Sequence, residues 1–156
     1  MVTRRLTEQD AEIGVHAIRL LKSVDGYPIP SALYLSNFLS RPNNVFIVAV
    51  DGASPVGYLV AYLLDRIDRD QRMALLYDIG VAEHLRKRGV GTWLVTELKR
   101  ICSDEGAMMW VHTSRSNVAA TRLFETTGGV PQPPEEGDVI YEYSSLNFAI
   151  PHVGDV

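Results

Sequence analysis

The chain has 156 residues, 46% of them hydrophobic and 22% charged, which is the composition of one ordinary globular domain with enough apolar residues for a core. Its net charge of −4 disfavours a nucleic-acid partner, because affinity for phosphate backbones needs a basic surface. The single cysteine, Cys102, excludes an internal disulfide, and no apolar run is long enough to span a bilayer. We therefore expect a cytoplasmic protein with no membrane partner.

The hydrophobic pattern predicts helices and strands that alternate in the second half of the chain. In chain order these are a helix from the capping box Thr7-Glu-Gln-Asp10 to about Ser23, a helix at 31–39, strands at 45–50, 56–64 and 74–82, a helix from about Gly89 to Asp104, a strand at 108–113, a helix at 118–127 and a strand at 139–146. Residues 1–6 carry no signal-like pattern and are expected to lead straight into the first helix. This order predicts a mixed α/β sheet with helices on both faces, formed by a single domain over 1–146 with a tail at 147–156.

The stretch Arg86-Lys-Arg-Gly-Val-Gly91 follows the strand 74–82 and opens a helix. Two glycines let the backbone approach a ligand, and the N–H groups of the turn and the helix dipole point the same way. Three cationic side chains at a helix start oppose the dipole unless an anion is bound, so a phosphate-bearing ligand is favoured over a plain helix start. The glycine patterns of dinucleotide-binding and mononucleotide-binding loops are both missing.

The pattern Arg-x-x-Gly-x-Gly, after a strand that ends in Ile79-Gly80-Val81, resembles the acetyl-CoA signature of the GNAT N-acetyltransferase superfamily. A second segment, from Asn117 to Gly129, resembles the Asn-x-x-Ala-x-x-Leu-Tyr segment of the same superfamily. The resemblance implies a mostly antiparallel central sheet that splays between its fourth and fifth strands, here between 74–82 and 108–113. It also implies acetyl-CoA as the cofactor and a homodimer.

From about Tyr34 to Val95 the chain looks more specifically like the type I aminoglycoside 3-N-acetyltransferases. The discriminating part is the run Tyr77-Asp-Ile-Gly-Val81, because few other branches place a carboxylate there. This likeness implies a small-molecule acceptor with a primary amine.

Two groups of residues are expected to bind the coenzyme. Ile79, Gly80 and Val81 are placed to offer backbone N–H groups to the thioester and the pantetheine amides, and Gly80 would permit a bulge that frees them. Asn117 would hydrogen-bond the pantetheine arm, and its structural alternative, a plain helix cap, is compatible with this role because both use the same position. The other candidates are Arg86, Lys87, Arg88, Gly89, Val90, Gly91 and Thr92 around the pyrophosphate, with Ala120 and Phe124 in the second segment.

Asp78 is the candidate base, because a carboxylate between apolar neighbours in a core strand needs a reason. It would bind the substrate ammonium, or remove its proton directly or through a water; a strand-end ion pair or an outward-facing acid is the structural alternative. Glu83 is the second candidate, although an ion pair with the basic loop explains it equally well. Phe124 stands where the superfamily usually has a proton-donating tyrosine, so Tyr77 and Tyr141 are the possible substitutes. No metal site is expected.

Acidic side chains in several loops would suit a polycationic acceptor. They are Asp25, Asp65, Asp68, Asp70, Glu135, Glu136 and Asp138. Arginines interleave with the acids of 65–72, so ordinary solvated ion pairs explain that loop equally well. The leading hypothesis is acetyl transfer to a primary amine of a small polycationic molecule, such as an aminoglycoside. The alternatives are a peptide N-terminus or a polyamine as acceptor, a CoA-binding regulatory module without turnover and, more weakly, a nucleotide-phosphate enzyme.

Overall fold

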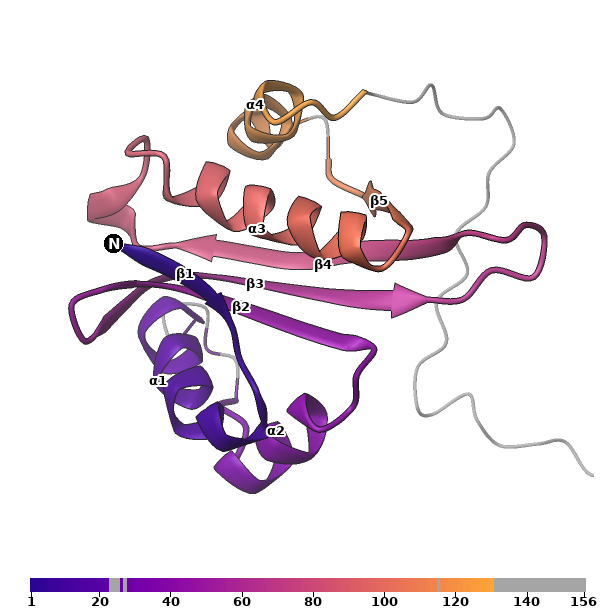
Figure 1. Ribbon diagram of the computed structural model, residues 1–156. Coiled ribbons are helices and arrows are strands. Elements are labelled where there is room, and N and C mark those ends of the chain that lie inside the picture. The colour runs from indigo at the N-terminus through magenta and orange to yellow at the C-terminus, as the bar shows by residue number, and fades with distance from the viewer. Residues whose placement is uncertain (23–25, 27, 115, 131–156) are drawn as a thin grey trace, which may run out of the picture.

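The computed structural model describes residues 1–22, 26, 28–114 and 116–130. These residues form a five-stranded sheet in the order β1-β2-β3-β4-β5, with α1 and α2 on one face and α3 and α4 on the other (Figure 1). The strands are β1 Val2–Arg5, β2 Asn44–Asp51, β3 Ser54–Leu64, β4 Arg72–Val81 and β5 Ala107–Val111. The helices are α1 Ala11–Lys22, α2 Ala32–Leu39, α3 Val90–Asp104 and α4 Val118–Thr126.

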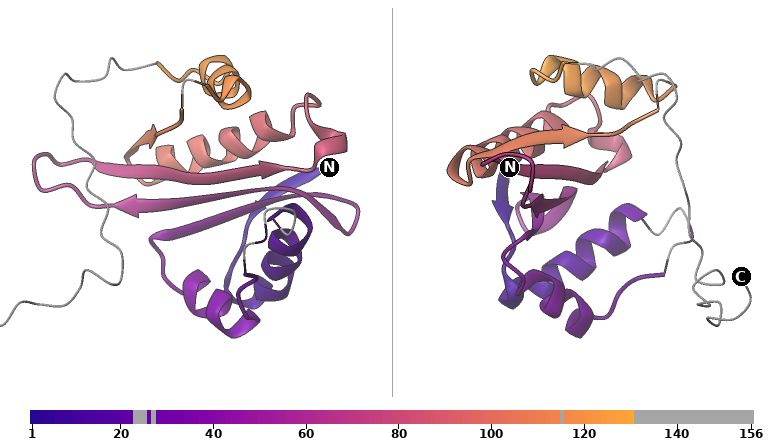
Figure 2. Two further views of the ribbon diagram at one scale, coloured as in Figure 1. Left: turned by 180° about the vertical axis from the view of Figure 1, so that it is seen from behind. Right: turned by 90° about the vertical axis from the view of Figure 1, so that its right-hand side faces the viewer.

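The sheet is mostly antiparallel. Neighbouring strands from β1 to β4 run antiparallel, and only β4 and β5 are parallel. The mixed sheet with helices on both faces is thus confirmed, and Figure 2 shows the two helical layers from the side. The predicted strand 139–146, its Tyr141, the tail 147–156 and the acidic residues Asp25, Glu135, Glu136 and Asp138 lie outside the described residues.

The prediction for residues 1–6 is wrong, because Val2–Arg5 form the edge strand β1. Val2 pairs with Val50 and Arg5 with Ile47. A four-residue edge strand with two arginines has too little apolar alternation to be recognised, and pairing with β2 defines it. After it, the Asp10 carboxylate accepts hydrogen bonds from the Thr7 N–H (2.9 Å) and hydroxyl (2.8 Å), as the capping box predicts.

The sheet is buried on both faces. Alternate side chains of β2 enter two separate cores: Val45 and Ile47 pack under α3, and Phe46 and Val48 pack against α1 and α2. Tyr58 of β3 belongs to the second core. Burial on both sides explains why β2 and β3 appear in the sequence as nearly continuous apolar runs.

The sheet splits between β4 and β5. Their pairing runs from Arg72↔Ala107 to Leu76↔Val111 and stops there. The rest of β4, Tyr77–Val81, pairs with β3 alone. The splay between the fourth and fifth strands therefore lies where the sequence places it, between 74–82 and 108–113.

Candidate functional site

The open edge of β4 presents backbone groups to the split. The Ala82 N–H donates to the Val56 carbonyl at 2.9 Å. In an antiparallel pair every second residue is hydrogen-bonded to the partner strand, so Gly80 and Asp78 also bond to β3 through their backbone groups. The N–H and C=O groups of Ile79 and Val81 fall between those residues and are directed away from β3. Their side chains pack against the core under α3. This edge can therefore bind a ligand with amide groups much as another strand would.

A bulge in β4 determines which face of the sheet the side chains of Tyr77 and Asp78 occupy at the split. Val60 of β3 pairs with Asp78 and the next residue, Ala61, pairs with Leu76, which leaves Tyr77 as the extra residue. Two successive strand residues normally point to opposite faces. Here Tyr77 and Asp78 both lie on the α1 and α2 face, because their contacts are Tyr62 and Tyr58 on that face.

Asp78 is held by a buried tyrosine. The Tyr58 hydroxyl donates to Asp78 Oδ2 at 3.0 Å, and Tyr58 is only 2% exposed. Its ring lies directly over Gly80, where an added Cβ would stand 2.4 Å from Tyr58 Cε1. Gly80 thus makes room for the ring that holds Asp78. The prediction of a bulge at Gly80 is wrong, since the register breaks at Tyr77.

The turn between β4 and α3 is exposed and basic. A short 3-10 turn, Glu83–Leu85, leads into Arg86, Lys87 and Arg88, whose side chains are all exposed. Gly89, with φ +84°, is the N-cap of α3 and supplies no side-chain cap. Lys87 has φ +61°, a left-handed conformation that is uncommon outside glycine and concentrates at ligand-binding turns. The first N–H groups of α3 therefore face a cationic turn, an arrangement suited to a phosphate.

The acetyltransferase (GNAT) family matches residues 13–128, which include the splayed β4, the basic turn and α4. The chain belongs to this family. As a member, it is an acetyl-CoA-dependent N-acetyltransferase.

Solved structures show the same fold. An aminoglycoside acetyltransferase, meta-AAC0020 from an uncultured soil metagenomic sample, crystallised with sisomicin, is 25% identical over 93% of this chain and 95% of that one, with a TM-score of 0.78. The aminoglycoside N-acetyltransferase AAC(6')-Iy in complex with CoA is 19% identical over 92% and 94% (TM-score 0.74). A ribosomal-protein-alanine N-acetyltransferase from Brucella melitensis biovar Abortus 2308 is 19% identical over 91% and 100% (TM-score 0.69). No curated protein matches the sequence.

The residues of this acetyltransferase fit acetyl-CoA in two places. The edge groups of Ile79 and Val81 suit the amides of the pantetheine arm, and the exposed Arg86, Lys87 and Arg88 beside the start of α3 suit the pyrophosphate. The exposed hydroxyl-bearing side chain of Thr92 lies one turn further along. Asn117 caps α4 by accepting from the Ala120 N–H at 3.1 Å, as its structural alternative predicts, and its side chain is exposed.

Three other predicted cofactor residues pack through their side chains, and a fourth, Gly91, allows close packing because it has none. Val90 is 1% exposed and Phe124 is 9% exposed, both in the core under α3, and Ala120 packs against that core. Gly91 leaves room for Leu123 of α4, whose Cδ2 would stand 3.1 Å from an added Cβ. Only the backbone groups of Val90 and Gly91 can face a ligand at the helix start.

Glu83 and the acids of the β3–β4 turn are exposed. Glu83 is exposed on the 3-10 turn, and no ion pair joins it to the basic turn within the described residues. The turn 65–71 lies at the opposite end of β4 from Arg86 (Figure 1). There Arg66 bonds Asp68 through two nitrogens, at 2.8 and 2.5 Å, and holds its pKa at about 2. Arg72 binds Asp65 at 2.8 Å. The structure favours solvated ion pairs for this turn over an acceptor rim.

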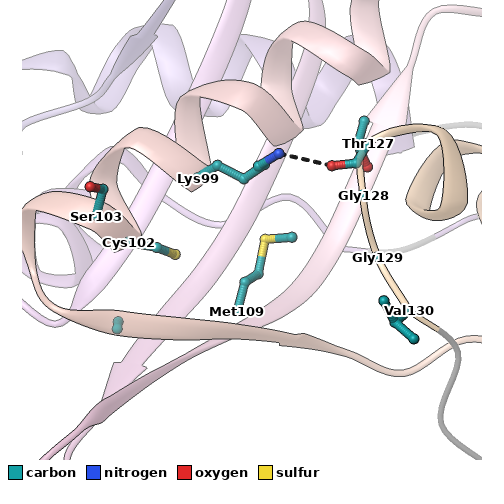
Figure 3. A pocket seen from close by; sticks show the side chains of 9 residues that line it. Lys99, Cys102, Ser103, Met109, Thr127, Gly128, Gly129 and Val130 are labelled. Carbon is teal, nitrogen blue, oxygen red and sulfur yellow. Dashed lines mark hydrogen bonds between the residues drawn. The ribbon is translucent and has the colours of Figure 1, made fainter.

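A hollow of about 500 Å³ lies on the α3 face, between α3, β5 and the residues after α4 (Figure 3). Lys99 crosses it to donate to the Thr127 carbonyl at 2.9 Å, which caps the end of α4. Cys102 also lines it, and burial raises the pKa of its thiol, so this cysteine is no nucleophile. None of the sequence-predicted site residues lines this hollow.

Within the described residues, no group of three or more His, Cys, Asp and Glu side chains could hold a metal ion. None of the described helices has the length and apolar character that a membrane crossing requires.

The residue that sequence reasoning missed is Tyr58, which lies 20 positions before Asp78 and reads as one more apolar residue of a buried strand. The signal in the sequence is Gly80, two residues after Asp78. A glycine in a strand indicates that another group packs closely against it, but it does not identify Tyr58 as that group.

Proposed function

We propose that this acetyltransferase acetylates a primary amine of a small polycationic acceptor of the aminoglycoside kind, with Asp78 as the residue that receives the amine. Bound acetyl-CoA supplies the acetyl group as a reactive thioester. What the protein has to supply is alignment of the amine, removal of its proton and hydrogen-bond donors for the thioester oxygen.

The pair formed by Tyr58 and Asp78 is the observation that carries this proposal. Asp78 lies where pairing with β5 has stopped, beside the open edge of β4, so an amine bound to it is next to the coenzyme site. The hydroxyl of the buried Tyr58 donates a hydrogen bond to the carboxylate and orients it. A fixed carboxylate can bind an ammonium group, and it can accept a proton directly or through a water.

The coenzyme is assigned to the groups described above. Ile79 and Val81 would bind the pantetheine through backbone groups, Gly80 would let the strand edge approach it, and Arg86, Lys87 and Arg88 would bind the pyrophosphate with the N–H groups of residues 89–92. The predicted role of Asn117 as a pantetheine donor stays part of this proposal, because the helix cap uses only the oxygen of its side-chain amide.

The leaving sulfur needs either a proton donor or stabilisation as a thiolate. Phe124 is buried in the core and has no hydroxyl, so the position that usually carries a tyrosine donates nothing here. A free thiol ionises near pH 8.5, so departure as a thiolate needs only modest stabilisation at neutral pH. Tyr77 is the candidate donor on β4, and Glu83 is the second candidate base.

The acceptor class rests on the carboxylate and on the likeness to the sisomicin-bound enzyme, at 25% identity. A peptide N-terminus or a linear polyamine is the competing acceptor, and the fold is shared with a ribosomal-protein-alanine N-acetyltransferase. Aminoglycoside acetylation would make the protein an antibiotic-resistance enzyme. The composition of the chain further predicts a cytoplasmic protein with one domain over 1–146. The superfamily resemblance implies a homodimer, which sedimentation equilibrium measures.

Release of free thiol from acetyl-CoA tests the proposal. The purified protein is assayed with sisomicin, spermine and an alanine-initiated peptide, each at matched concentration. We expect the highest kcat/KM with sisomicin. Preference for the peptide or for spermine would assign the alternative acceptor, and tight CoA binding without thiol release on any amine would assign the regulatory module.

A further inference from the structure

The bulge places an aromatic ring immediately beside the carboxylate. Tyr77 and Asp78 are consecutive residues on one face of the sheet, which a regular strand does not allow. The Tyr77 side chain is 68% exposed, whereas its neighbours on this face are covered by α1 and α2. A large aromatic side chain left in water at a strand centre is unusual and suggests a binding role.

The Tyr77 ring is supported by a row of aromatic side chains. Its centroid lies 5.5 Å from that of Tyr62 at an interplanar angle of 76°, and Tyr62 in turn meets Phe38 of α2 at 6.0 Å and 81°. Both contacts are edge-to-face, which is a favourable aromatic geometry. Burial, with the Tyr77 and Tyr34 hydroxyls nearby, raises the pKa of Tyr62, so this supporting phenol stays neutral. The row from Phe38 to Tyr77 therefore holds the exposed ring in one orientation.

Resting on the proposed function, we infer that the Tyr77 ring, rather than its hydroxyl, is the specificity-determining group for the acceptor, and that it selects amines carried on a saturated six-membered ring. Such an acceptor places its ring carbons on the Tyr77 face while its ammonium group meets the Asp78 carboxylate and the π-electrons of the ring. The charge and the apolar surface of an aminosugar or aminocyclitol match these two neighbours.

A linear polyamine carries the same charge but gains less from this surface. Its chain has to give up rotational freedom to lie flat on one aromatic ring, whereas a six-membered ring is already rigid. The Asp78 carboxylate serves both acceptors equally. The aromatic ring is therefore the part of the site that separates cyclic from linear amines.

The test compares the wild-type protein with Tyr77→Ala, Tyr77→Phe and the surface control Ile67→Ala, using thiol release at saturating acetyl-CoA with sisomicin and with spermine. Ile67 is fully exposed in the turn at the far end of β4. We expect Tyr77→Ala to raise the KM for sisomicin about tenfold and to change that for spermine less than about twofold. Ile67→Ala should leave both KM values and both kcat values within about twofold. Tyr77→Phe keeps the aromatic ring, so it should keep the wild-type ratio of the KM for spermine to the KM for sisomicin.

Each other result overturns a defined part of this assignment. Equal losses with both amines in Tyr77→Ala would remove the selective role of the ring and leave the proposed function standing. Loss of the wild-type KM ratio in Tyr77→Phe would assign the selectivity to the hydroxyl and overturn the role of the ring. Failure of the wild-type protein to acetylate sisomicin would overturn the proposed function and this inference with it. Tm and CoA affinity check that each variant is folded, and Tyr77→Leu, which has an apolar side chain without an aromatic ring, carries the test if the alanine variant is not folded.

Discussion

The bulge at Tyr77 and Asp78 lies in β4, and the basic turn Arg86–Gly91 follows the end of the same strand. The two regions are nevertheless built in different ways. The turn is six consecutive residues whose charge and backbone conformation are local properties. The acceptor side needs a register break in β4, a tyrosine from β3 and a glycine that admits its ring. A site formed by consecutive residues can be predicted from the sequence. A site formed by the register of two strands can be recognised only once the pairing of the strands is known.

The comparison predicts that substitutions in the bulge affect turnover of the amine and that substitutions in the basic turn affect CoA binding. Asp78→Asn should lower kcat/KM for the amine by about 100-fold or more, because the amide neither accepts a proton nor binds an ammonium group as a charge. CoA affinity, measured by calorimetry, should change less than about twofold. Asp70→Asn, in the exposed turn 65–71, is the matched control and should behave as wild type. A comparable loss of CoA affinity in Asp78→Asn would show that Asp78 also contributes to coenzyme binding, and the two regions would then not have separate roles.

Gly80→Ala tests the packing that supports the acceptor side. The new Cβ would lie 2.4 Å from a buried ring, so the Tyr58 ring has to move away from Asp78. We expect a loss of about 1–3 kcal/mol in the free energy of unfolding and a fall in kcat/KM. Urea denaturation and thiol release measure the two effects. Unchanged stability with full activity would mean that Gly80 has no part in seating Tyr58.

Arg88→Ala tests the other region. It should weaken CoA binding by about three- to tenfold and leave kcat at saturating acetyl-CoA unchanged, since a phosphate contact positions the coenzyme and takes no part in proton transfer. Added salt should weaken the wild type more than the variant. Arg19→Ala, on the exposed side of α1, is the charge-matched control. A fall in kcat at saturation would contradict the division of labour.

Asp10→Asn lies outside both regions and should affect stability alone. The Thr7 backbone N–H is the main cause that lowers the pKa of Asp10, and the Thr7 hydroxyl and Arg4 act in the same direction. Because the folded pKa is below the unfolded value near 3.9, the contribution is present above about pH 4 and is lost as the pH falls below it. We expect a loss of about 0.5–1 kcal/mol at pH 7 that disappears near pH 2, by urea denaturation. A loss independent of pH would point to packing.

The sequence predicted those parts that local rules determine. The strands β2 and β3, the capping box of Thr7 and Asp10 and the turn before α3 follow from apolar runs, two polar side chains and two glycines. The short polar strand β1 was missed because its pairing partner is more than 40 residues away. The bulge was placed at Gly80 because glycine permits one, whereas pairing with β3 puts it at Tyr77.

Residue type also misassigned some side chains. Phe124 and Val90 lie within motifs that indicate a cofactor, yet both side chains pack in the core under α3. Motif positions are occupied for packing as well as for binding, and only the structure separates the two roles. Tyr58 is the reverse case, since a buried tyrosine in an apolar strand gives no sign that its hydroxyl reaches a carboxylate on the next strand.

The most direct test is a double-mutant cycle on kcat/KM for the acceptor, with Tyr58→Phe, Asp78→Asn and the double variant. Tyr58 lies beneath Asp78 and acts by orienting it, so Tyr58→Phe alone should cost about tenfold and should cost nothing further once Asp78 is asparagine. Losses that multiply in the double variant would show that the two residues act independently, and the acceptor site would then not be the carboxylate held at the split of the sheet.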